Sequence, residues 1–137
     1  MRASQNIQSV LIAAQDLRLA RLIQDYLVKT GYRVECYGNL GTTLERLLET
    51  HVDLLIVDGE MPEKVLNDFV VTVAGLKPDL QMMAVGISER EEQGRTLSAF
   101  VGAFVEKPFS IYDISDTIQE LPEKGPFDQT KMRAKWH

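Results

Sequence analysis

The feature that most constrains this chain is a regular alternation of two hydrophobic patterns along most of its length. Short apolar runs of strand length recur, and longer segments with apolar residues three and four apart, as on one face of a helix, lie between them. The runs predict five strands, at 10–14, 33–37, 54–57, 82–85 and 103–105. The longer segments predict five helices carrying apolar stripes at 19–27, 40–48, 65–73, 97–101 and 111–121.

Strands that are apolar at consecutive positions need cover on both faces, and helices between parallel strands provide it. The sequence therefore predicts an α/β fold: a (βα)5 doubly wound, five-stranded parallel sheet of flavodoxin-like topology. Local signals mark helix ends. Asp16 is a suitable N-cap for the first helix and Gly31 a suitable left-handed stop after it. Ser110, followed three residues later by Asp113, resembles a capping box before the last helix.

The domain organisation follows from the length and from where the alternation stops. A chain of 137 residues is the size of one ordinary domain. After position 121 the periodic pattern ends, and Pro122, Gly125 and Pro126 break up a polar stretch. We expect one domain over residues 1–121 and a tail or linker over residues 122–137.

Charge and composition exclude several classes of protein. Fifteen Lys and Arg against twenty Asp and Glu give a net charge of −5, so no overall basic field attracts nucleic acid, and nucleic-acid binding is not expected. No run approaches the roughly 18 apolar residues of a membrane span. The single cysteine, Cys36, cannot form a disulfide within the chain. We expect a cytoplasmic protein without a membrane segment.

Two charged residues stand at predicted strand ends, where open parallel sheets bind ligands. Asp58 directly follows the apolar run 54–57, and Lys107 follows the last strand closely. Because a buried carboxylate is costly without a partner, we expect Lys107 to pair with Asp58. The turn after the first strand lacks the glycines of a phosphate-binding loop, and no Ser/His/Asp set is recognisable. The sequence therefore does not predict an enzyme, and a small flavodoxin-like ligand-binding protein is disfavoured.

The ordered motifs resemble the receiver domain of response regulators, the phosphoacceptor module of two-component signalling. The resemblance covers residues 9 to about 121 and is carried by Leu-Leu-Ile-Val-Asp58-Gly-Glu-Met-Pro62 and by Lys107-Pro108-Phe. It implies that Asp58 accepts a phosphoryl group from a histidine kinase or phosphotransfer protein, and that Lys107 contacts the phosphoryl oxygens. It also implies structural roles for Pro62, in a Met-Pro turn, and for Pro108, after a cis peptide bond.

The chain departs from this family at the position of its metal ligands. Receiver domains carry an acidic pair at the end of the first strand, where this chain has Ala14 and Gln15. Magnesium is an implied cofactor whose binding these two residues should weaken, because a neutral amide replaces a carboxylate. The candidate ligands are then Asp58, Gln15, an inward-turned Asp16 and the side chain of Glu60.

The switch positions also differ, and they leave two functions open. Gly86 stands where the family has a small hydroxyl residue; Ser88 could serve if the alignment shifts by two, and Phe104 falls at the family's reporting aromatic position. The first function is a receiver phosphorylated on Asp58. The alternative is a phosphorylation-independent pseudo-receiver, a docking or dimerisation module. We expect a homodimer, if one forms, to use the face between the fourth and fifth helices.

Overall fold

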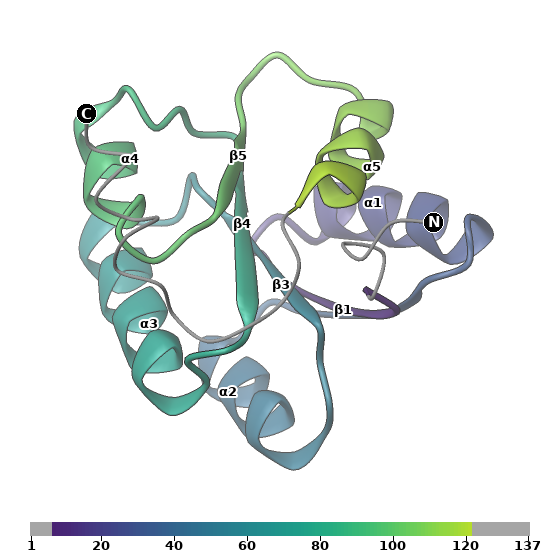
Figure 1. The fold of residues 1–137 in the computed structure, drawn as a ribbon, viewed down its shortest axis with the longest axis horizontal. Helices are drawn as coiled ribbons and strands as arrows, with labels where there is room; N and C mark the ends of the chain where they lie inside the picture. The colour runs from purple at the N-terminus through teal and green to yellow at the C-terminus, as the bar shows by residue number, and fades with distance from the viewer. Residues whose placement is uncertain (1–6, 122–137) are drawn as a thin grey trace.

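The computed structural model describes residues 7–121, which form one five-stranded parallel sheet with helices on both sides (Figure 1). The strand order is β2-β1-β3-β4-β5. The strands are β1 (Ser9–Ala13), β2 (Arg33–Tyr37), β3 (Leu54–Asp58), β4 (Gln81–Val85) and β5 (Ala103–Val105). The helices are α1 (Leu17–Lys29), α2 (Leu40–Glu49), α3 (Glu63–Leu76), α4 (Glu92–Leu97) and α5 (Ile111–Glu120). The predicted fold class is confirmed, whereas the predicted tail at 122–137 lies outside the described residues.

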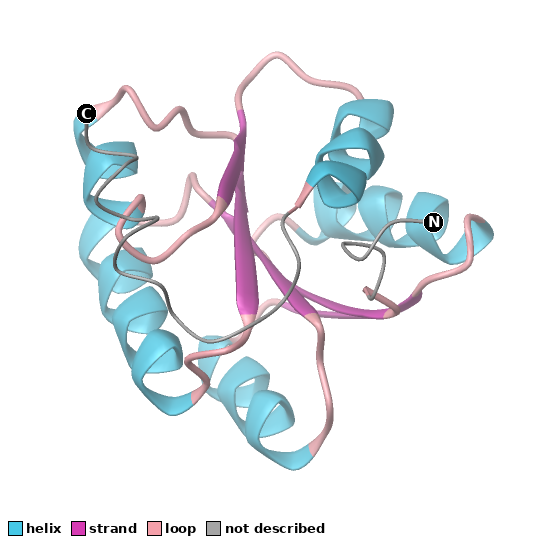
Figure 2. Cartoon of the chain, in the orientation of Figure 1, coloured by secondary structure: helices cyan, strands magenta, loops and turns pink. Residues whose placement is uncertain are grey.

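Two hydrophobic layers sandwich the sheet, with α1 and α5 on one face and α2, α3 and α4 on the other (Figure 2). Successive side chains of a strand point to opposite faces, and β1 feeds both layers in this way. Leu11 and Ala13 pack with the helices α2 to α4, while Val10 and Ile12 pack with α1 and α5. This explains why the central strands are apolar at every position.

The predicted helix ends are confirmed where the signal is local. The Asp16 carboxylate accepts hydrogen bonds from the backbone N–H groups of Arg18, at 3.0 Å, and Leu19, at 3.3 Å, and so caps α1. Gly31 has a φ of 109°, the left-handed conformation that glycine adopts without strain. Ser110 and Asp113 form the reciprocal capping box of α5. The side chains of Asp16, Ser110 and Asp113 satisfy backbone donors at the starts of α1 and α5, and Gly31 lets the chain turn away after the end of α1.

The fourth helix differs from the prediction, which placed the stripe 97–101 on it. In the structure α4 ends at Leu97, and Phe100 and Val101 follow it. The chain must enter β5 two residues after Val101, and the backbone N–H of Gly102 already donates to the carbonyl oxygen of Met82 at 2.9 Å. Pairing with the sheet therefore ends the helix before the apolar stripe does.

Within residues 7–121, no helix combines the length and the apolar character needed to cross a membrane.

Candidate functional site

Four strand ends bring the predicted site residues together at the carboxyl edge of the sheet. Asp58 is the last residue of β3, which lies between β1 and β4. Asp16 follows β1, Gly86 follows β4, and Lys107 follows β5. The connections run in opposite directions from β1 and β3, and open parallel sheets bind ligands at this switch point. The site therefore lies where the topology favours one.

Asp58 is a buried carboxylate, with 9% of its surface exposed. Its Oδ1 accepts a hydrogen bond from the backbone N–H of Glu60 at 2.9 Å, and the backbone of Asp16 contributes another. Burial nevertheless raises the pKa of Asp58 above its ordinary value, and the negative charges of Glu60 and Asp16 add to the rise. A carboxylate whose anion is incompletely stabilised in a cleft is typical of functional sites.

Apolar residues beside Asp58 account for its desolvation. A small space of about 10 Å³ borders this residue, and every other residue that lines it is apolar. One of these is Ala14, which is buried and occupies the position where the receiver resemblance leads us to expect an acid. These other lining residues are Ile12, Ala14, Leu19, Ala20, Ile23, Ile56, Val57 and Val85. The side of Asp58 that faces α1 is thus hydrocarbon rather than a ring of oxygen ligands.

Lys107 does not form the expected pair with Asp58. Its ammonium group forms an ion pair with the carboxylate of Glu60, and both side chains are about half exposed. The hydrogen bond and the charge of Glu60 raise the pKa of Lys107, and Asp58 contributes the weakest of the effects that act on it. Two anions therefore compete at this edge for one cation, and the more exposed anion holds it.

The magnesium ligands considered from the sequence do not converge. Asp16 points its carboxylate at the first turn of α1 and does not make the inward turn considered as one way to complete the metal site. Glu60 is engaged by Lys107, and Gln15 is exposed. Across residues 7–121, no three His, Cys, Asp or Glu side chains lie close enough together to hold a metal ion. Mg²⁺ in proteins is usually held by one or two carboxylates and several waters, so Asp58 would be its main protein ligand here, and weak binding of Mg²⁺ stays a prediction.

The three predicted switch residues lie on β5 and on the loop after β4. Gly86 has a φ of 92°, and its backbone N–H donates to the carbonyl oxygen of Val105 at 2.8 Å. Ser88 is buried, and its hydroxyl oxygen accepts a hydrogen bond from the backbone N–H of Arg90 at 3.0 Å. Phe104 is half-buried against the core on the α2 to α4 side. Their role as a switch stays a prediction.

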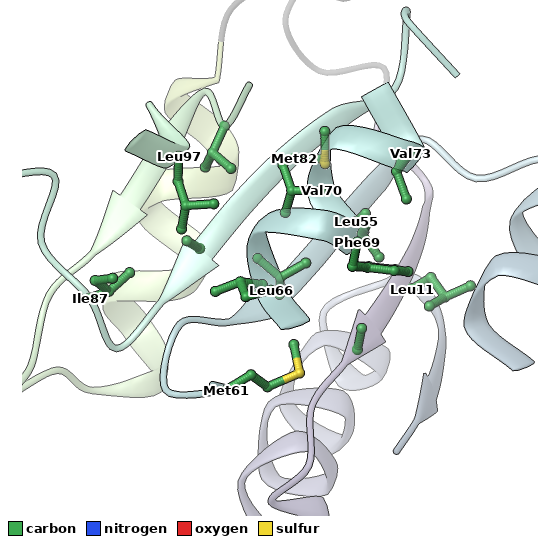
Figure 3. Packing of buried hydrophobic residues seen from close by; sticks show 14 of the residues in the cluster. Leu11, Leu55, Met61, Leu66, Phe69, Val70, Val73, Met82, Ile87 and Leu97 are labelled. Carbon is green, nitrogen blue, oxygen red and sulfur yellow. The ribbon is translucent and has the colours of Figure 1, made fainter. Parts of the chain in front are cut away.

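Sequence analysis missed the close fit of Gly59 against Ile87. Ile87 belongs to the buried cluster shown in Figure 3 together with Met61 and Leu66. A Cβ atom at position 59 would lie 2.4 Å from the Cγ2 of Ile87, so only glycine fits there without rearrangement. The signal was available, since a glycine directly after a strand-end aspartate indicates close backbone approach. The contact fixes the turn that carries Glu60.

The two prolines singled out from the sequence border this site. Pro62 is the N-cap residue of α3, directly after the turn that follows Asp58. The Lys107–Pro108 peptide bond is cis, as the receiver resemblance implies. Both prolines therefore occupy the chain bends that lead away from Asp58 and Lys107.

A second buried aspartate, which sequence analysis also missed, lies at the opposite edge of the sheet. Oδ2 of Asp53 accepts hydrogen bonds from the backbone N–H groups of Gln8, at 3.0 Å, and Ser9, at 3.1 Å. Nε2 of His51 lies 2.7 Å from its Oδ1. Burial opposes ionisation of Asp53, but these hydrogen bonds outweigh it and lower its pKa. A pocket of about 350 Å³ opens beside this cluster, and the Asp58 site does not line it.

Comparisons with known proteins agree on one family of relatives. No protein-family model matches the chain. In sequence it is 26% identical over 121 residues to the response regulator receiver protein CpdR of Brucella abortus (strain 2308), an alignment that covers 84% of this chain and 97% of CpdR.

Solved structures of response regulators share the fold. The chemotaxis protein CheY4 of Vibrio cholerae superposes with a TM-score of 0.76 at 19% identity, over 85% of this chain and 99% of CheY4. The response regulator TrrA of Thermotoga maritima, solved in complex with Mg(2+)-BeF, superposes with a TM-score of 0.72 at 18% identity, over 85% of this chain and 100% of TrrA. At these identities the structural likeness establishes a common fold.

Proposed function

We propose that this chain acts as a response-regulator receiver domain of two-component signalling, as its similarity to CpdR and its shared fold with CheY4 support, and that Asp58 is its phosphoacceptor. One observation carries the proposal: Asp58 is a buried carboxylate at the end of a central strand, at the switch point of the sheet, and burial destabilises its anion. The backbone N–H groups that hold this carboxylate restrict its orientation, which favours reaction at one oxygen.

The proposed chemistry is a phosphoryl transfer from a histidine kinase or phosphotransfer protein. A carboxylate oxygen of Asp58 attacks the phosphorus atom of a phosphohistidine. The P–O bond forms as the P–N bond breaks, and the departing imidazole nitrogen takes a proton from solvent. The products are an aspartyl phosphate and a neutral histidine. In this proposal the domain is the acceptor in a signalling reaction and not an enzyme with a substrate of its own.

The charge of the transferred group must be offset by the protein, because phosphoryl transfer depends mainly on positioning and electrostatics. The response regulator TrrA was solved in complex with Mg(2+)-BeF, whereas in this chain the carboxylates of Glu60 and Asp16 have other partners, which leaves Asp58 as the main ligand for such an ion. Lys107 and the backbone N–H groups around Asp58 are the groups of this chain that could also offset the charge. This makes the engagement of Lys107 by Glu60 important for function.

The readout of phosphorylation is proposed to involve Gly86, Ser88 and Phe104. Phe104 pairs with Ala84 within the β4–β5 ladder, and Gly86, directly after β4, donates its backbone N–H to Val105, so a displacement of the end of β4 can reach β5. Phe100, in the segment after α4, has an exposed ring, whereas the ring of Tyr112 on α5 lies edge-on to Tyr26 of α1, with centroids 5.5 Å apart. A homodimer through the face between α4 and α5 stays a prediction.

The test is direct phosphorylation with phosphoramidate, a small donor with a P–N bond. We expect intact-mass measurement to detect one added phosphoryl group per chain in the wild type and none in Asp58→Asn. NMR spectra with magnesium chloride and beryllofluoride should change around Asp58, Lys107 and Phe104 in the wild type alone. An unmodified wild type, beside a known receiver that is modified in the same solution, would refute the proposal and favour a phosphorylation-independent docking module.

A further inference from the structure

The carboxylate of Glu60 occupies the space between Lys107 and Gly86. Glu60 Oε2 pairs with the Lys107 ammonium group and lies 3.7 Å from the point where a Cβ atom at position 86 would stand. The Cγ of Glu60 lies 3.6 Å from the same point. Because Gly86 carries no side chain, the Glu60 side chain can lie over the end of β4 and reach the start of the loop after β5.

This placement puts a negative charge beside the position that a phosphoryl group on Asp58 would need. The Glu60 backbone N–H donates to Asp58 Oδ1, so the competing carboxylate is tethered two residues from the acceptor. Lys107 has one ammonium group, and the Glu60 carboxylate already holds it. An incoming phosphoryl group would meet both a cation that is engaged and an anion that repels it.

We propose that Glu60 is a positioning residue that competes with the phosphoryl group for Lys107, so that Asp58 is loaded slowly until the Glu60 side chain moves away. This inference rests on the proposed function of Asp58. In the unphosphorylated domain, the carboxylate of Glu60 pairs with the ammonium group of Lys107 in place of a phosphoryl group. The pair can open, because side chains that are 58% and 53% exposed form an ion pair of modest strength.

The chain offers a matched control for this competition. Glu106 directly precedes Lys107 in sequence, is 45% exposed, and lies with its carboxylate 3.7 Å from the guanidinium group of Arg90. Glu60→Gln and Glu106→Gln each remove one negative charge from the same edge of the domain. Only the first removes the partner of Lys107. A general effect of net charge would appear in both variants.

The experiment measures two quantities in the wild type and in both variants. The first is the initial rate of phosphoryl transfer from phosphoramidate to Asp58, followed by intact mass. The second is the affinity of Lys107 for inorganic phosphate, followed by NMR at the ε-methylene group of Lys107. We expect Glu60→Gln to raise the rate and to tighten phosphate binding by about tenfold each, and Glu106→Gln to change neither appreciably. Thermal unfolding checks that all three proteins are folded.

Each remaining outcome overturns one specific statement. An unchanged or lower rate in Glu60→Gln, or an equal rise in Glu106→Gln, would overturn the competition. If no protein takes a phosphoryl group, the proposed function fails, and the phosphate titration alone decides the competition. Equal phosphate affinity of Lys107 in the wild type and in Glu60→Gln would then overturn it, while tighter binding in Glu60→Gln alone would support it.

Discussion

Asp53 and Asp58 stand at the two ends of β3 and are buried to almost the same degree, with 7% and 9% of their surfaces exposed. The pKa values of the two aspartates are nevertheless shifted in opposite directions. The pKa of Asp53 is lowered because two backbone N–H groups and His51 outweigh its burial. The pKa of Asp58 is raised because burial and neighbouring negative charges outweigh its backbone hydrogen bonds.

The difference shows that burial alone does not decide what a buried carboxylate does. The environment of Asp53 compensates the charge, and the carboxylate in turn holds the residues that lead into β1 against β3. The environment of Asp58 leaves its charge incompletely compensated, and the ammonium group of Lys107 at the same edge is held by Glu60. One end of the strand therefore serves stability, and the other retains the reactivity that the proposed function requires.

The largest effect on stability should come from Asp53→Ala. This substitution leaves the backbone N–H groups of Gln8 and Ser9 without their acceptor in a buried setting, so we expect the free energy of unfolding to fall by about 2–3 kcal/mol. Urea denaturation at neutral pH measures the loss. The matched variant Asp58→Ala should lose clearly less, because it removes a charge that the fold stabilises poorly. Equal losses would contradict the comparison.

Next in size is Gly59→Ala, which tests how the turn after Asp58 is fixed. The added methyl group would meet Ile87 at 2.4 Å, so we expect overpacking to destabilise the domain by about 1–3 kcal/mol. Gly75, in α3, is the control, because a Cβ atom there has nothing within 4 Å. Gly75→Ala should stabilise by about 0.5–1 kcal/mol, since alanine favours a helix. Both values come from the same denaturation assay, and a neutral Gly59→Ala would contradict the packing argument.

Sequence reasoning recovered those parts of the fold that depend on local signals. Four of the five strands coincide with apolar runs and β2 with the β-rich segment 33–37, and Asp16, Gly31 and the Ser110 capping box act at the helix ends as predicted. It failed at α4, where the turn into β5 overrides the stripe of apolar residues. A hydrogen bond to a distant strand is invisible in a local pattern.

The sequence predicted which residues lie at the candidate site but not which of them pair with one another. Parallel topology brings Asp58, Lys107 and Gly86 to one edge whatever their rotamers are. Which carboxylate holds Lys107 depends on side-chain reach across a turn, which sequence spacing does not determine. Asp53 was missed for a related reason, because its backbone partners lie 44 and 45 residues away.

A smaller and pH-dependent effect should distinguish Asp58→Asn. The folded pKa of Asp58 is raised, so its ionisation costs stability above the folded pKa and costs nothing below the unfolded value, near 4. The amide of this variant would keep an acceptor for the Glu60 backbone N–H without the charge. We therefore expect the variant to exceed the wild type in stability by up to about 1 kcal/mol at pH 7, and this gain to vanish below about pH 4.

Denaturation at a series of pH values measures that gain. The opposite dependence is expected at Asp53, whose folded pKa is lowered. The stability contributed by the Asp53 carboxylate is present above the unfolded value and is lost as the pH falls through the folded pKa. Asp53→Asn should therefore be less stable than the wild type at pH 7, by an amount that shrinks in acid. Parallel profiles for the two variants would contradict the difference in sign.

The smallest effect is expected for His51→Ala. This variant measures how much of the stabilisation of the Asp53 carboxylate comes from His51 and how much from the backbone. The imidazole lies 2.7 Å from Asp53 Oδ1, but the His51 side chain is 69% exposed, and the backbone N–H groups of Gln8 and Ser9 have larger effects on the carboxylate. We expect the pKa of Asp53 to rise and yet stay below its ordinary value, with a loss of about 0.2–1 kcal/mol in stability. An NMR titration of the Asp53 carboxyl carbon measures the first quantity and urea denaturation the second. A loss as large as that of Asp53→Ala would assign the compensation to the histidine. The contrast between the two ends of β3 would then rest on one exposed side chain, and not on the backbone that joins β1 to β3.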